Sequence, residues 1–106
     1  GGTLTCIDPE PADGFGEWAK AQPHVRHLAQ PSLDALKTAE AADAWFVDGD
    51  HNYYTVFNEL KAIDALQQST GKPLLAFLHD VSWPCARRAF YYAPERIPRG
   101  WRHPHA

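Results

Sequence analysis

Three runs of apolar residues in this chain each end in an acidic residue. The runs are residues 3–7 before Asp8, residues 44–47 before Asp48, and residues 74–78 before the pair His79 and Asp80. Unbroken apolar runs are typical of buried parallel strands, and open α/β sheets bind ligands at the carboxyl ends of such strands. If the three runs lie parallel in one sheet, their acids gather along one edge. We expect the functional site at that edge.

The rest of the pattern alternates between helix and strand. We expect strands at residues 3–8, 25–29, 44–48 and 74–80, with helices at residues 14–22, over about ten residues from a capping Ser32, and after residue 52. The last helix has the clearest pattern, with apolar residues at helical spacing: Tyr53, Val56, Phe57, Leu60, Ile63 and Leu66. Strands that alternate with helices predict an α/β fold, a parallel sheet with right-handed crossovers and helices on both faces.

The strands at residues 44–48 and 74–80 are joined by one amphipathic helix, so we expect them to be neighbours. Adjacent strands lie ~4.8 Å apart. Asp48 would then lie close enough to His79 and Asp80 to share a metal ion or a substrate hydroxyl.

Composition narrows the class of protein. With 106 residues, 44% of them hydrophobic, the chain is about one small folded domain. No run approaches the ~20 apolar residues of a membrane span, and the two cysteines have neither metal-ligand spacing nor the density of a disulfide scaffold. We therefore expect a cytoplasmic protein. The chain starts with glycine and contains no methionine, so we expect further sequence before Gly1.

Charge is unevenly spread along the chain. Residues 1–80 carry 12 acidic and 5 basic residues, whereas residues 81–106 carry one acid and five arginines among several aromatic residues. The net charge of −3 argues against a nucleic-acid partner. We favour an interpretation in which the C-terminal aromatic residues cover the domain and the arginines balance its acidic body.

Two motifs carry a family resemblance. Residues 46–54 read F-V-D-G-D-H-N-Y-Y, and residues 78–81 read L-H-D-V. Together they resemble the class I S-adenosylmethionine-dependent methyltransferases, in particular the metal-dependent O-methyltransferase-like branch with a D-G-D-H segment after the fourth strand and an H-D pair after the fifth. The resemblance implies a partial Rossmann-like core at residues 1–84, comprising the second to fifth family strands. Residues 85–106 would pack on this core or extend it.

The resemblance also implies roles for single residues. Asp8 would accept hydrogen bonds from the ribose hydroxyls of S-adenosylmethionine, and Ser32 would lie near the adenine. Asp48, His79 and Asp80 would hold Mg²⁺ or another divalent cation, which would lower the pKa of the acceptor hydroxyl and orient it. Asp48 would thereby take part in catalysis, with His51 as the general base. The acceptor would be a small molecule with a hydroxyl group.

The chain departs from this family at the glycine-rich loop, which has no counterpart here. The family's first strand and its last two strands are also absent from these 106 residues. We therefore expect little or no methyltransferase activity from this chain alone. The missing first strand would leave strand edges and apolar faces uncovered, so we expect a homodimer or a larger assembly.

Other interpretations remain open. A single aspartate after a strand is often only a helix cap, and we expect this role for Asp50, while His51 is equally well explained as a turn residue. A metal-dependent phosphoesterase would also use Gly-Asp-His and His-Asp elements, but its further ligand motifs are missing. A non-catalytic Rossmann-like remnant could act as an interaction module through its C-terminal arginine and aromatic residues.

Overall fold

The computed structural model describes residues 1–49, 52–79 and 94–101. In this part of the chain, four strands and three α-helices alternate, followed by two short 3₁₀-helices. The chain divides into two compact units, Gly1–Thr38 and Ala39–Ala106. Asp50, His51 and Asp80 lie outside the described residues.

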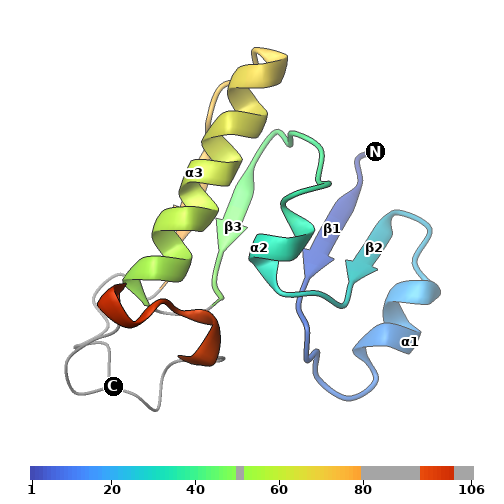
Figure 1. The fold of residues 1–106 in the computed structure, drawn as a ribbon. Helices are drawn as coiled ribbons and strands as arrows, with labels where there is room; N and C mark the ends of the chain where they lie inside the picture. Colours follow the sequence, from blue (N-terminus) through green and yellow to red (C-terminus); the bar gives the residue numbers. More distant parts are fainter. Residues whose placement is uncertain (50–51, 80–93, 102–106) are drawn as a thin grey trace. The chain divides into compact units, whose positions relative to one another are not determined.

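The first unit is a β-α-β arrangement. Strands β1 (Leu4–Ile7) and β2 (Val25–Leu28) pair in parallel, with Leu4 opposite Val25. Helix α1 (Phe15–Lys20) connects them and lies beside β2 in Figure 1. It starts after Gly14, whose φ of 83° lies in the left-handed region that glycine adopts at low cost.

Helix α2 (Ser32–Ala35) is much shorter than the ten residues expected. The backbone N–H of Leu36 still reaches Ser32 O, but Lys37 and Thr38 donate to the carbonyls three residues back, so the α-helical pattern ends. The N-cap is Pro31, and Ser32 is the first helical residue. The prediction that Ser32 caps a long helix is therefore wrong.

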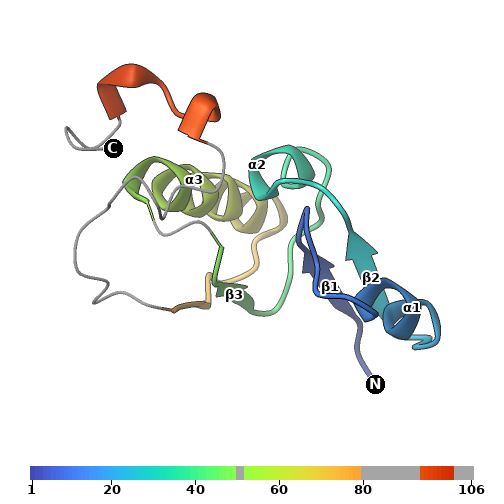
Figure 2. The same cartoon turned by 90° about the horizontal axis from the view of Figure 1, so that it is seen from below.

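The second unit is also a β-α-β arrangement. Strands β3 (Trp45–Val47) and β4 (Ala76–Leu78) pair in parallel, with Phe46 opposite Phe77. The 18-residue helix α3 (Tyr53–Thr70) joins them and lies along β3 in Figures 1 and 2. It ends at Gly71, whose φ of 73° lets the N–H of Lys72 reach Gln67 O at 3.1 Å.

The two faces of the β3–β4 pair differ. Trp45 faces α3, because its indole Nε1 donates to Gln67 Oε1. Successive side chains of a strand alternate between faces, so Phe46 lies on the opposite face. There it stacks on Phe77 at 6.5 Å, and the two residues are 69% and 53% exposed. The face away from α3 is therefore apolar and open in the described part of the chain.

The most buried residues of α3 are mostly polar. Thr55, Glu59, Ile63 and Gln67 recur every four residues and are at most 8% exposed. The apolar residues that predicted this helix lie largely to either side of them. Of those residues only Ile63 is buried, while Tyr53 and Phe57 are exposed. The helix was predicted correctly, but its buried face was not.

Two 3₁₀-helices, η2 (Pro94–Arg96) and η3 (Arg99–Trp101), lie near the start of α3 in Figure 2. The indole of Trp101 stacks on Tyr53 at 5.6 Å and on Phe57 at 6.0 Å, while Ile97 is only 2% exposed. This part of the C-terminal segment thus packs against α3.

The α/β class is confirmed. Short parallel strands alternate with helices, which is consistent with a partial Rossmann-like fold. Among the described residues, no helix is long and apolar enough to cross a membrane.

Candidate active site

Asp48 and His79 follow directly on the paired ends of β3 and β4. The register that sets Val47 opposite Leu78 continues by one residue, since the N–H of His79 donates to Val47 O at 3.0 Å. The next residues therefore meet: His79 Nδ1 lies 2.9 Å from Asp48 Oδ1. The strand pattern of the sequence predicts that these two residues come together, and they do.

The contact with Asp48 determines which nitrogen of the His79 imidazole carries the proton. A carboxylate only accepts hydrogen bonds, so Nδ1 must carry a proton for this contact to be a hydrogen bond. The neutral form of His79 in that contact has Nε2 as its acceptor. The second carboxylate oxygen of Asp48, Oδ2, is not the atom that faces Nδ1 in this contact. Both side chains are about half exposed, at 48% for Asp48 and 52% for His79.

The pair extends the apolar face of the strands. Phe46 and Asp48 are two residues apart on one strand, and Phe77 and His79 are two residues apart on the other, so alternation places all four on the face away from α3. The imidazole of His79 lies 6.4 Å from the ring of Phe46. A polar pair thus stands at the end of an aromatic strip.

Asn52 and Glu59 are buried polar residues at the start of α3 and about two turns into it. Asn52 is the N-cap of α3, where its Oδ1 accepts from Thr55 N at 2.9 Å, and it is only 4% exposed. The expectation that Asp50 is the cap is therefore wrong. A Cβ added to Gly49 would lie 3.5 Å from Oε1 of Glu59, so the buried Glu59 carboxylate lies near Gly49, the residue after Asp48.

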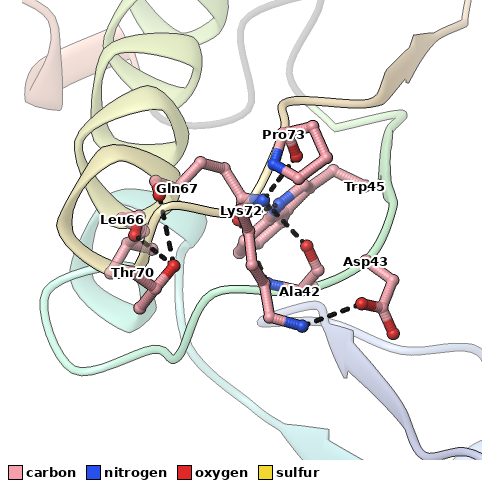
Figure 3. A network of polar contacts seen from close by, with 8 residues as sticks. All are labelled: Ala42, Asp43, Trp45, Leu66, Gln67, Thr70, Lys72 and Pro73. Atoms are coloured by element: carbon pink, nitrogen blue, oxygen red, sulfur yellow. Dashed lines mark hydrogen bonds and ion pairs between the residues drawn. The ribbon is translucent and has the colours of Figure 1, made fainter.

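The opposite ends of the strands are tied to α3 by Gln67 (Figure 3). Its Oε1 accepts from Ala42 N at 3.1 Å and from Trp45 Nε1 at 3.0 Å, while its Nε2 donates to Ala42 O and Pro73 O, both at 2.9 Å. Both donors and both acceptor sites of this fully buried amide are used. The amide therefore fixes the chain just before β3 and just before β4 against one point of the helix.

An ion pair lies beside this network in Figure 3. Lys72 Nζ is 2.8 Å from Asp43 Oδ1. The hydrogen bond from Lys72, together with its positive charge, lowers the pKa of the Asp43 carboxyl below its ordinary value of 3.8.

In the first unit, Asp8 follows β1 as expected and is exposed. Its N–H donates to Leu28 O at 3.1 Å, and its Oδ1 accepts from Glu10 N at 2.9 Å, which forms a local turn. His27 Nε2 lies 3.1 Å from the backbone oxygen of Asp8. These contacts fix the backbone of Asp8, and its carboxylate faces solvent.

The complete set of expected metal ligands is not covered by the structure. Asp80 lies outside the described residues, as does His51, the expected base. Among residues 1–49, 52–79 and 94–101, no three potential metal-ligating side chains form a cluster. Asp48 and His79 provide a carboxylate and an imidazole, which are donors that suit a divalent transition metal.

Three buried polar residues beside β3 and at the start of α3 were not predicted from the sequence. Asn52 could have been found, because an asparagine directly before the first apolar residue of a helical pattern is a typical N-cap. Glu59 and Gln67 gave no such signal, since polar residues in a long helix are usually exposed.

A family model described as a methyltransferase domain matches residues 1–81. No curated protein and no solved structure gave a significant match. Since the family match covers most of the chain, the chain belongs to this methyltransferase-domain family. The cofactor of such a domain is in general S-adenosylmethionine.

Proposed function

We propose that this chain is the core of an S-adenosylmethionine-dependent O-methyltransferase that acts on a small molecule with a hydroxyl group. The contact between Asp48 and His79 carries the proposal. It places two chemically active side chains at neighbouring carboxyl ends of parallel strands, where α/β sheets bind ligands. Both residues lie within the part of the chain that the methyltransferase family matches.

The cofactor would bind through Asp8. Its exposed carboxylate retains an oxygen besides Oδ1, which accepts from Glu10 N, and a carboxylate can accept hydrogen bonds from both hydroxyls of a ribose. Ser32, at the start of α2, would contact the adenine. S-adenosylmethionine would supply the methyl group.

The acceptor would bind near Asp48 and His79. These residues, together with Asp80, would hold a divalent cation, which lowers the pKa of a bound hydroxyl and orients it. To bind the same ion, Asp48 and His79 would exchange their direct hydrogen bond for bonds to the ion, for which their oxygen and nitrogen donors are suited. His51 would act as the base that removes the hydroxyl proton. The apolar strip of Phe46 and Phe77 would border the acceptor and limit its access to water.

The 106-residue chain is expected to show little or no methyl transfer alone. It has no glycine-rich loop for the methionine end of the cofactor, and binding energy lost there cannot position the methyl group. In this proposal residues 1–84 form the methyltransferase core, and residues 85–106 form an accessory segment.

Nucleoside binding tests the proposal. Adenosine titrated into the isotopically labelled chain should shift the amide resonances of Asp8 and Ser32. An Asp8→Asn variant should bind adenosine on the order of 10- to 100-fold more weakly, since a hydrogen bond to a charged group contributes roughly 1.5–3 kcal/mol. The matched control is Glu10→Gln, which removes a carboxylate two residues away and keeps the backbone N–H that Asp8 uses.

S-adenosylhomocysteine should bind no more tightly than adenosine, because the chain holds only the nucleoside part. Micromolar binding of S-adenosylhomocysteine would show that the missing loop matters less than proposed. If millimolar adenosine leaves the Asp8 resonance unchanged, the cofactor site is wrong, and a non-catalytic interaction module becomes the better interpretation.

A further inference from the structure

Two buried polar residues of α3, Glu59 and Gln67, lie near opposite ends of β3. Gln67 lies near the end of the helix and binds the chain just before β3. Glu59 lies about two turns from the start of the helix, and its Oε1 would be 3.5 Å from a Cβ added to Gly49, just after β3. The role of Gln67 follows from its four hydrogen bonds. The role of Glu59 is not explained by the proposed chemistry.

Glu59 is an expensive residue to bury. It is only 4% exposed, and a buried carboxylate is costly unless polar groups compensate for the lost water. An apolar side chain of similar size would fill the same space without that cost. Ile63, one turn further along the same face, is an example of such a residue.

Gly49, which lies near the Glu59 carboxylate, is the residue directly after Asp48. Strand β3 ends at Val47, so Asp48 is the first residue beyond the pairing of the strands. Its side chain is about half exposed, which leaves room for it to move. A displacement of about 1 Å would lengthen the 2.9 Å contact with His79 beyond the range of a hydrogen bond.

We propose that Glu59 is a positioning residue whose buried carboxylate supports the turn at Gly49 and so keeps Asp48 in contact with His79. The inference deepens the proposed function, on which it rests for the role of the Asp48–His79 pair. Glu59 acts through the turn, without contact with substrate. Gln67 and Glu59 then act at opposite ends of β3, since Gln67 holds the start of the strand against the helix and Glu59 holds the residues that follow its end.

The state of the His79 imidazole is the direct measure of this role. In the wild-type chain the contact with Asp48 favours the proton on Nδ1. Nitrogen-15 NMR of the neutral imidazole reports which of its two nitrogens carries the proton. An Asp48→Ala variant provides the reference spectrum for the lost contact.

We expect Glu59→Ala to move the His79 nitrogen shifts most of the way from the wild-type values to those of Asp48→Ala. Glu59→Gln, which keeps the shape of the side chain, should move them part of the way. The matched control is Asp64→Asn, which removes a carboxylate from the exposed side of the same helix and should leave His79 unchanged.

A second resonance separates repositioning from general damage. The indole N–H of Trp45 is hydrogen-bonded to Gln67 and reports whether α3 still packs on β3. Altered His79 shifts with an unchanged Trp45 indole signal support the proposal. If Glu59→Ala fails to fold, Glu59→Gln decides the question, because it removes the charge with little change in volume.

Wild-type His79 shifts in folded Glu59→Ala or Glu59→Gln would overturn the positioning role. Equal changes at His79 and Trp45 in both variants would also overturn it, since Glu59 would then serve only the packing of the helix. Neither measurement depends on cofactor or metal. Failure here is therefore distinct from failure of the nucleoside test at Asp8.

Discussion

Trp45 Nε1 donates a 3.0 Å hydrogen bond to Oε1 of the fully buried Gln67. The same amide serves Ala42 and Pro73, so the position of β3 and the approach to β4 both depend on one side chain. Since β3 and β4 carry Asp48 and His79 at their far ends, this network supports the site from a distance.

Replacing Gln67 with leucine should lower the free energy of unfolding by about 3–5 kcal/mol. The change leaves up to four polar groups of Ala42, Trp45 and Pro73 without their partner, and each buried unpaired group costs about 1–3 kcal/mol before the structure relaxes. Urea unfolding measures the loss. The control Gln68→Leu alters an exposed neighbour and should stay within about 0.5 kcal/mol of wild type. Equal stability of the two variants would contradict the role assigned to the Gln67 network.

Removing the N-cap of α3 should by itself lower the stability of the protein by a measurable amount. Asn52→Ala deletes the 2.9 Å hydrogen bond to Thr55 N and should cost about 1 kcal/mol, while Asn52→Ser should retain most of the stability because serine is also a good cap. Thermal or urea unfolding of the three proteins provides the comparison. An alanine variant as stable as the serine variant would show that Asn52 does not stabilise the helix start.

Asp43 should titrate below its ordinary pKa because of Lys72. A carboxyl whose folded pKa is lowered binds fewer protons in the native state than in the unfolded state. Its stabilising effect is therefore present above the unfolded pKa and is lost as the pH falls through the folded value. In Lys72→Met, NMR titration of the Asp43 carboxyl should show its pKa rising toward 3.8. An unchanged pKa would show that the ion pair does not persist in solution.

The apolar face of β3 and β4 should lead to self-association. Parallel strands are normally covered on both faces, yet Phe46 and Phe77 are 69% and 53% exposed. Light scattering at micromolar concentration should give about twice the chain mass of 11.9 kDa or more. Phe46→Ser should weaken the assembly, whereas Trp18→Ser, at an exposed aromatic residue of the first unit, should not. A stable wild-type monomer would contradict this expectation.

The sequence predicted the elements better than their burial. Apolar runs and helical spacing placed all four strands and α3 within about two residues, because local pattern determines them. The predicted length of α2 was wrong. The N-cap at Pro31 and the change after Ala35 to hydrogen bonds that span three residues both depend on local backbone geometry. The predicted buried face of α3 was wrong in part because Gln67 is held inside by hydrogen bonds to Ala42 and Trp45, which lie more than 20 residues away in the sequence. No pattern along the chain reveals such partners.

The same distinction applies to the site. The meeting of Asp48 and His79 followed from parallel pairing alone, since residues after paired strands come together. Their direct contact did not follow, because it depends on the rotamers of both side chains. The expectation that the pair shares a cation with Asp80 therefore requires an experiment.

The central claim is that Asp48 and His79 form the active site of the domain, and binding of Mn²⁺ tests this claim most directly. Titrating Mn²⁺ into the labelled chain should broaden the resonances of Val47 and His79 first, with weak affinity because few ligands are available. Asp48→Ala should abolish this broadening, whereas His24→Ala, at an exposed histidine of the first unit, should leave it intact. Indistinguishable titration curves for the wild type and Asp48→Ala would contradict the claim.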